Sequence, residues 1–159
     1  PGVVYWKDMI APEQVNDGLF DFCDILPTAL TLAEAGDSLP TDRYIDGVDQ
    51  TSFLLADDGL SARKYIYYWI QDTFAAVRVG EYKMVQAGMS SGDDDTVIAG
   101  AWTTQEYYPY GKTFNLYLDP KEQHAFTVRK LMLTSLFTNA INTHKATYKQ
   151  YPSTIQVGG

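Results

Sequence analysis

The chain has 159 residues, a formal net charge of −8 and one cysteine, Cys23. The acidic balance repels phosphate backbones and no basic stripe reverses it locally, so we expect no nucleic-acid binding. One cysteine excludes an intrachain disulfide, and no apolar run approaches the roughly 18 residues of a membrane span. Hydrophobic residues make up 45 % and charged residues 20 %, which indicates one globular domain, or one domain with the edge of another.

The first part of the chain predicts one helix and much irregular structure. Residues 3–6 are β-prone and predict an opening strand. Residues 25–35 predict a helix in which Asp24 caps the free N–H groups of the first turn and Gly36 ends the last turn. The expected apolar face of this helix consists of Leu26, Leu30 and Ala33.

A long connection follows over residues 37–63, with a short helical turn expected near residues 52–55. The pattern then changes to a period of two, which is typical of strands. We expect strands at residues 65–70, 74–79, 82–87, 96–103 and 113–118. The turn Gly80-Glu81 joins the second and third strands into a hairpin.

The last part of the chain predicts a long helix. Apolar residues recur at three- and four-residue steps from Lys121 to about Gln150, between Pro120 and Pro152. The order of elements indicates an α+β fold rather than a βαβ fold. We therefore expect an antiparallel β-sheet of about four strands packed against a long C-terminal helix, preceded by the N-terminal helix and the long loop.

No complete catalytic site is evident from spacing alone. The carboxylate clusters at residues 57–58 and 93–95 have the oxygen ligands that hard cations prefer, but they lack EF-hand spacing and adjoin glycines, which favours solvated turns. His144 lies in the apolar stripe of the last helix, so a packed or capping histidine is expected. The sequence has no G-x-S-x-G elbow, and one cysteine cannot provide zinc-finger spacing.

An aromatic run provides the candidate binding residues. Residues 107–110, with Trp102 nearby, have side chains that can stack on a sugar or an aryl group. The competing and favoured interpretation is that these rings cover the core at a strand edge. The substrate-rim candidates are Trp102, Tyr108, Tyr110 and His124.

Five short motifs, in order, resemble those of sulfatases. Residues 1–4 (PGVV) resemble the end of a W-P-G-x-I strand, and residues 24–33 (DILPTALTLA) resemble a D-[ILV]-x-P-T-x-L-x-L-A-G helix. Residues 45–49 (IDGVD) are similar to an [IL]-D-G-x-[DN] loop. Residues 76–83 (AVRVGEYK) resemble the hairpin A-[VL]-R-x-G-x-[WY]-K, and residues 114–122 (FNLYLDPKE) resemble [LF]-[FY]-[ND]-L-x-x-D-P-x-E.

The resemblance is to the C-terminal region of a type I, arylsulfatase-like sulfatase of the alkaline phosphatase superfamily. It implies that residues 1–62 are the trailing segment of the catalytic domain and that residues 63–159 are the C-terminal subdomain. The family forms formylglycine within a C/S-x-P-x-R motif and uses a divalent cation, usually calcium, with a catalytic Lys and His. These groups precede the W-P-G strand, so the resemblance implies no catalytic residue, metal site or cofactor within these 159 residues.

The sequence also departs from the family pattern. Cys23 is followed by DILP rather than by x-P-x-R, and Ala125-Phe126 replace the Asn that follows D-P-x-E in the family. Three interpretations therefore remain open. The chain is the inactive C-terminal piece of a sulfatase, or a stand-alone binding or assembly module from a truncated sulfatase gene, or a separate enzyme that uses the aromatic run and His124. The apolar face of the first helix predicts a partner, either the N-terminal sulfatase part or a second copy of the chain.

Overall fold

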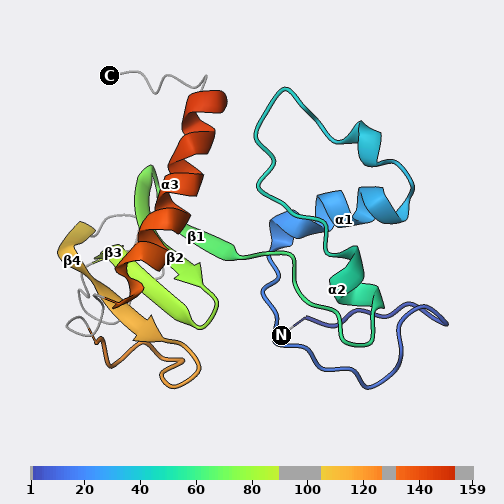
Figure 1. Ribbon diagram of the computed structural model, residues 1–159, viewed down its shortest axis with the longest axis horizontal. Helices are drawn as coiled ribbons and strands as arrows, with labels where there is room; N and C mark the ends of the chain where they lie inside the picture. Colours follow the sequence, from blue (N-terminus) through green and yellow to red (C-terminus); the bar gives the residue numbers. More distant parts are fainter. Residues whose placement is uncertain (1, 90–104, 127–131, 153–159) are drawn as a thin grey trace. The chain divides into compact units, whose positions relative to one another are not determined.

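The computed structural model describes residues 2–89, 105–126 and 132–152. The chain divides into two compact units (Figure 1). Residues 1–64 with 147–159 form what we call the N-terminal unit, and residues 65–146 form the sheet unit. Within the described ranges, no helix is both long and apolar enough to cross a membrane.

The sheet unit contains an antiparallel four-stranded sheet in the order β1-β2-β3-β4. Its strands are β1 (Tyr65–Ile70), β2 (Thr73–Val79), β3 (Tyr82–Met89) and β4 (Gln105–Asn115). The first three confirm the predicted strands and the Gly80-Glu81 hairpin. The strand expected at residues 96–103 lies outside the described residues.

The last strand was predicted at the wrong place, because β4 covers residues 105–115 rather than 113–118. The Asn115 side chain ends it: its Oδ1 accepts hydrogen bonds from the backbone N–H groups of Tyr117 (3.0 Å) and Leu118 (3.2 Å). This local bond pattern bends the chain into a turn where the sequence suggested continued strand.

A wide bulge interrupts the pairing of β3 with β4. Val85 is paired with Lys112 and Ala87 with Tyr107, so residues 108–111 lie opposite Gln86 alone. Pro109 within this segment has no N–H to donate to a ladder. Gly111 has φ of 64°, a left-handed conformation that glycine adopts without steric cost.

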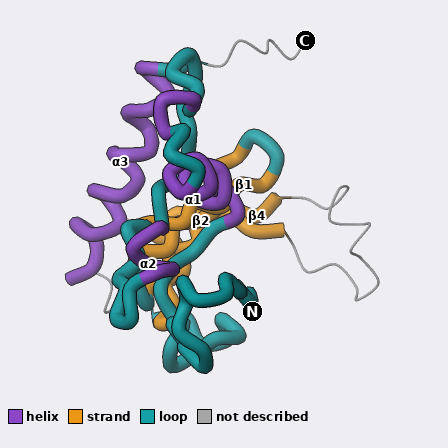
Figure 2. Tube along the Cα trace, turned by 90° about the vertical axis from the view of Figure 1, so that its right-hand side faces the viewer, coloured by secondary structure: helices purple, strands orange, loops and turns teal. Residues whose placement is uncertain are grey.

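Helix α3 (Thr134–Gln150) covers one face of the sheet, as Figure 1 shows and as Figure 2 shows from the side. The buried core of the sheet unit consists of Val77, Met84, Phe137 and Ala140. Tyr67 Oη donates a hydrogen bond of 2.9 Å to the Ala140 carbonyl. The buried His144 ring stacks on Tyr67 with 3.9 Å between ring centroids, which confirms the expected packed histidine.

The predicted start of the last helix at Lys121 is wrong, since α3 begins at Thr134. Residues 121–126 are not helical. Glu122 has φ of 54°, outside the right-handed helical region. The Asp119 carboxylate accepts hydrogen bonds from the backbone of Gln123 (3.1 Å) and His124 (2.7 Å), so these N–H groups are satisfied without a helix.

The N-terminal unit contains two short helices, α1 (Ile25–Leu32) and α2 (Thr51–Leu55), joined by irregular chain. Helix α2 confirms the expected turn. Helix α1 ends earlier than predicted, because Glu34 rather than Gly36 adopts the left-handed conformation, with φ of 55°. Ala35 N then donates to the Leu30 carbonyl, and Glu34 N donates to Thr31, which is the Schellman arrangement.

Two further expectations for this unit are wrong. Residues 3–6 form no strand, since the described sheet consists of β1 to β4. The side chains of residues 3–6 are exposed. The predicted apolar face of α1 is not the buried one. Leu26 and Ala33 are exposed, whereas Pro27 and Thr28 are buried.

We predict that Phe137→Ala destabilises the protein by about 3–5 kcal/mol, because it opens a cavity between α3 and the sheet. The matched control is Leu136→Ala, one residue away on the exposed side of the same helix. Urea denaturation followed by circular dichroism measures both free energies of unfolding. Equal losses for the two variants would contradict this account of the core.

Candidate functional site

The most deeply buried charges of the described chain are Asp24, at the start of α1, and Arg63, shortly before β1. Their side chains are 0 % and 4 % exposed. Arg63 Nε donates to both carboxylate oxygens of Asp24, at 2.8 and 3.1 Å, and Nη2 donates to the same carboxylate. The predicted capping role of Asp24 is wrong, because its side chain makes no cap hydrogen bond to α1.

Other backbone and side-chain donors occupy the remaining hydrogen-bond acceptor positions of the Asp24 carboxylate. It accepts hydrogen bonds from the backbone N–H groups of Asp21 (2.9 Å) and Val48 (2.8 Å), and from Gln50 Nε2 (3.3 Å). Burial by itself would raise the pKa of Asp24, but the bonds from Arg63 and these donors outweigh burial and lower it. Asp24 is therefore a fixed carboxylate at neutral pH.

Gln50 extends this network through the N-terminal unit. Its buried carboxamide donates to Ser61 Oγ (3.0 Å) and to the Leu19 carbonyl (3.3 Å), and it accepts from Ala62 N (3.0 Å). Its backbone N–H donates to Thr28 Oγ1 at 3.0 Å. Among the described residues of this unit, the buried aliphatic side chains are those of Leu19 and Pro27. In the N-terminal unit, hydrogen bonds between buried polar groups thus replace an apolar core.

The loop at residues 45–49 contacts the start of α1 closely. A Cβ on Gly47 would collide with the Cys23 carbonyl and crowd the Pro27 ring, so only glycine fits there. The carbonyl of Asp46 accepts a hydrogen bond of 2.8 Å from Arg63 Nη2. Two of the motifs quoted above, residues 24–33 and 45–49, are therefore joined by Arg63.

Cys23 belongs to this structural network and is a poor nucleophile. Arg63 Nη2 lies 3.0 Å from its sulfur. Burial nevertheless raises the pKa of the Cys23 thiol to about 12, and the lowering effect of Arg63 does not overcome it. Because the thiolate is the reactive species, this cysteine is unreactive at neutral pH.

A second ion pair joins the other two motifs in the sheet unit. Lys83, at the end of the hairpin motif, lies 2.6 Å from Glu122 of the D-P-x-E motif. The Lys83 ammonium is also 4.6 Å from the centre of the Tyr68 ring. The chain after β4 is held further by Leu116 N, which donates to the Glu81 carbonyl at 2.8 Å. These contacts fix the loop that leads toward α3.

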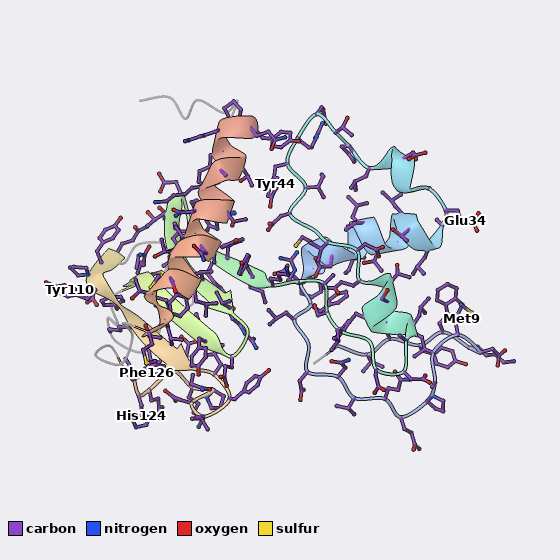
Figure 3. All side chains as sticks on the ribbon, viewed as in Figure 1. Met9, Glu34, Tyr44, Tyr110, His124 and Phe126 are labelled. Carbon is purple, nitrogen blue, oxygen red and sulfur yellow. The ribbon has the colours of Figure 1, made fainter. Side chains whose placement is uncertain are left out.

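The substrate-rim candidates do not form one described cluster. Tyr108 and Tyr110 lie in the bulge of β4, whereas His124 lies in the loop after β4, and Figure 3 shows Tyr110 and His124 at separate places. His124 is exposed, with Nδ1 3.8 Å from Asp119. Among the described residues, His124 contacts Asp119 and makes no hydrogen bond or ring contact with either tyrosine. Trp102 lies outside the described residues.

The acidic residues that the structure describes form no metal-binding cluster. Asp57 Oδ1 accepts a hydrogen bond from Gln14 Nε2 at 3.3 Å at the surface. Within residues 2–89, 105–126 and 132–152, no group of three or more His, Cys, Asp or Glu is arranged to hold a metal ion. The cluster at residues 93–95 lies outside the described residues.

Sequence analysis missed Arg63 and the Lys83–Glu122 pair. The Asp24–Arg63 and Lys83–Glu122 pairs each join residues about forty positions apart in the sequence. No periodic pattern relates the two residues of either pair. One signal was available for Arg63. A buried carboxylate needs a charged partner, and Arg63 is the nearest downstream arginine with no acidic residue beside it in the sequence.

We predict that Asp24→Asn destabilises the N-terminal unit by about 3–5 kcal/mol, because the buried Arg63 charge loses its partner. The control is Asp42→Asn at the exposed Asp42–Arg43 pair, which should leave the unfolding midpoint unchanged. Urea denaturation at pH 7 measures both. Equal midpoints for the Asp24→Asn variant and the parent chain would contradict the role given to this pair.

The pH dependence gives a second check of the same pair. The pKa of Asp24 is lower in the folded chain than in the unfolded chain. The stability from its charge is therefore complete above the ordinary carboxyl pKa of about 3.9 and is lost as the pH falls below that value. The stability difference between parent and Asp24→Asn should shrink on acidification below about pH 4. A constant difference down to pH 2 would contradict this assignment.

Comparison with known proteins finds similarity to sulfatases. Residues 75–149 match the family described as "Putative sulfatase AslA C-terminal domain". An arylsulfatase of Hemicentrotus pulcherrimus is 33 % identical over 111 residues, which cover 68 % of this chain and 19 % of that protein. An N-acetylgalactosamine-6-sulfatase of Mus musculus is 36 % identical over 83 residues, covering 52 % of this chain and 15 % of that protein.

The fold agrees with the sequence matches. The crystal structure of the PsFucS1 sulfatase from Pseudoalteromonas sp. superposes with a TM-score of 0.86 and 36 % identity, covering 95 % of this chain and 30 % of that chain. The chain thus spans less than a third of the length of these relatives. Its α+β architecture, motif order and matched residues lead to one conclusion: the chain has the sequence and the fold of the C-terminal region of the sulfatase family.

Proposed function

We propose that this chain is the C-terminal scaffold of a sulfatase and does not itself carry the groups that cleave a sulfate ester. The observation that carries the proposal is the role of its family motifs. Arg63 joins two of them through the Asp24 carboxylate and the Asp46 carbonyl, and Lys83 joins two more through Glu122. These four motifs hold the fold and do not present a reactive group.

The chemistry of sulfate ester cleavage also supports a scaffold role for this chain, with the reactive groups elsewhere in the enzyme. Breaking the S–O bond requires charge stabilisation at the sulfate oxygens, which a metal with Lys and His provides in the resembled family. The sequence has no C/S-x-P-x-R motif, and Cys23 is bound into a structural network with its pKa raised to about 12. The relatives are several times longer, so the reactive groups are proposed to lie in polypeptide beyond these residues.

The names of the relatives suggest the class of substrate. Several are N-acetylgalactosamine-6-sulfatases at 32–36 % identity over 83 residues. We therefore propose that the complete enzyme acts on the sulfate ester of a sugar.

The exposed apolar residues of the N-terminal unit suggest where the rest of the enzyme binds. Phe22, in the turn directly before α1, is 88 % exposed, and Ile25 and Leu26, the first two residues of α1, are half exposed. We call these three residues the α1 face. Apolar surface of this kind is typically covered by a partner. We propose that the N-terminal sulfatase part is that partner, and that self-association covers the same face when that part is absent.

The alternative is a stand-alone binding or assembly module. The α1 face is compatible with it, because a module would also need cover for these side chains. The coding sequence upstream of residue 1 separates the two. An in-frame C-x-P-x-R motif supports the sulfatase assignment, whereas a start codon directly before Pro1 supports the module.

We predict that the purified 159-residue chain does not hydrolyse an aryl sulfate above the uncatalysed rate, with or without added Ca²⁺. The positive control is the Pseudoalteromonas sulfatase assayed under the same conditions. Turnover that stays with the chain through purification, and that disappears on Cys23→Ala substitution, would contradict the proposal.

We predict that the 159-residue chain self-associates in a concentration-dependent manner, as measured by light scattering. Replacing the α1 face with Phe22→Ser, Ile25→Ser and Leu26→Ser should restore a monomer, because the apolar surface is removed while the Asp24 network stays intact. Leu118→Ser, at an exposed leucine of the sheet unit, is the matched control and should not change association. A parent chain that remains monomeric at all concentrations would contradict the role of this face.

A further inference from the structure

We propose that residues 113–118 are a concealed pairing segment, which adds as a strand to the same segment of a second copy of the chain when a covering strap opens. The strap consists of residues 119–126, which follow the pairing segment directly. Both lie in the sheet unit, and their behaviour does not depend on the sulfatase assignment.

The pairing segment has the sequence of a strand but is a strand over only half of its length. Residues 113–118 (TFNLYL) contain no charge, proline or glycine, and apolar side chains occupy every second position. In the structure β4 ends at Asn115, and the side chains of Tyr117 and Leu118 are 64 % and 85 % exposed in the turn that follows. Contacts made in the folded chain must therefore oppose the strand preference of residues 116–118.

Hydrogen bonds at Asn115 hold this turn. Its side-chain Oδ1 accepts the two backbone bonds that end β4, at 3.0 and 3.2 Å, and its own carbonyl accepts one from Asp119 N at 2.8 Å. Leu116 N donates to the Glu81 carbonyl, also at 2.8 Å. An extended strand through residue 118 would break the bonds to the Asn115 side chain, so the turn and the longer strand are alternative conformations of the same residues.

The strap closes over the outer edge of β4. Phe126, labelled in Figure 3, donates a backbone hydrogen bond of 2.9 Å to the Thr113 carbonyl. Thr113 is paired with Met84 of β3 on its inner side, and Phe126 lies outside this ladder, so the bond occupies an acceptor of the outer edge. The Phe126 ring also contacts the Tyr82 ring edge-on, with 6.3 Å between centroids. While the strap is closed, another strand cannot pair at Thr113.

The Lys83–Glu122 ion pair is the latch of the strap. The two side chains are 16 % and 31 % exposed, and their charged groups are 2.6 Å apart. Glu122 has φ of 54°, a left-handed conformation that costs free energy in a residue other than glycine. The ion pair offsets this strain. Without the carboxylate the strain remains, so the equilibrium of the strap shifts toward the open form.

An open strap leaves β4 free to continue through residue 118. The bulge at residues 108–111 ends where Lys112 returns to register, so the longer strand would be regular from Lys112 onward. Uncharged identical segments can pair even though the whole chain has a net charge of −8, because no like charges meet within the pair. A second copy of the chain is therefore the partner that this segment fits.

Amide hydrogen exchange of the full 159-residue chain measures the latch. Glu122→Gln keeps the size of the side chain but removes its charge, and it should speed exchange at the Phe126 amide about fivefold, the upper range for a partly exposed ion pair. Exchange at Val77, in the core of the sheet unit, should not change, because the opening is local. Glu106→Gln, at an exposed acid of β4 outside the strap, is the matched control and should change neither amide. Unchanged exchange at Phe126 in the Glu122→Gln variant would overturn the proposal.

A second variant opens the turn from its other end. Asn115→Val removes the Oδ1 acceptor and introduces a β-branched side chain, while the Lys83–Glu122 pair stays intact. Exchange at the amides of Tyr117 and Leu118 should become faster than in the parent chain. This variant decides the outcome if Glu122→Gln does not fold, and parent-like exchange at both amides would count against the proposal.

Thioflavin T fluorescence of concentrated protein measures strand addition between copies. The parent chain should give no signal, because association through the α1 face adds no strand, whereas Glu122→Gln and Asn115→Val should each give a rising signal. Adding Tyr117→Lys with Leu118→Lys to either variant should suppress it, since like charges then meet when identical strands pair. Both positions are exposed, so these lysines leave the closed fold intact. A signal that survives the two lysines, or no signal from either opened variant, would show that the pairing segment is wrongly assigned.

Discussion

The ion pair between Asp24 and Arg63 is the interaction on which the N-terminal unit depends. A buried carboxylate is stable only when its charge and its lone pairs are all satisfied. Arg63 supplies the charge, and backbone donors from Asp21 and Val48 supply the remaining bonds. This ion pair thereby holds three segments at one point: the start of α1, the loop at residues 45–49 and the segment before β1. The contact explains why segments with little regular structure adopt a defined fold.

The two units are stabilised by opposite means. In the sheet unit, Val77, Met84, Phe137 and Ala140 form an apolar core between α3 and the sheet. In the N-terminal unit, a hydrogen-bonded network occupies the interior, and large apolar side chains such as Phe22 are exposed. A unit with polar groups inside and apolar groups outside is suited to an interface, because the network sets its shape and the exposed side chains supply the contact energy.

Much of the sheet unit is predictable from sequence because its signals are local. The alternation in β1 and β2, the Gly80 turn and the helical spacing around His144 depend on neighbouring residues alone. The start of α3, the end of α1 and the extent of β4 are not predictable in this way. Side chains such as Asp119 and Asn115 bond to nearby backbone and override the periodic pattern. Arg63 was missed because its partner is 39 residues distant, and of the rim candidates that the structure describes, Tyr108 and Tyr110 share a strand and His124 does not.

The irregular pairing of β4 has a consequence for the behaviour of the sheet in solution. In the described sheet β4 is an edge strand, and an edge offers unpaired backbone groups on which a strand from another molecule can add. The four-residue excursion at residues 108–111, with a proline inside it, breaks that row of donors and acceptors near its middle. A foreign strand would find only short matching stretches on either side. The chain can therefore expose Tyr107 and Tyr110 on the edge strand β4 without promoting fibrous aggregation along this edge of the sheet.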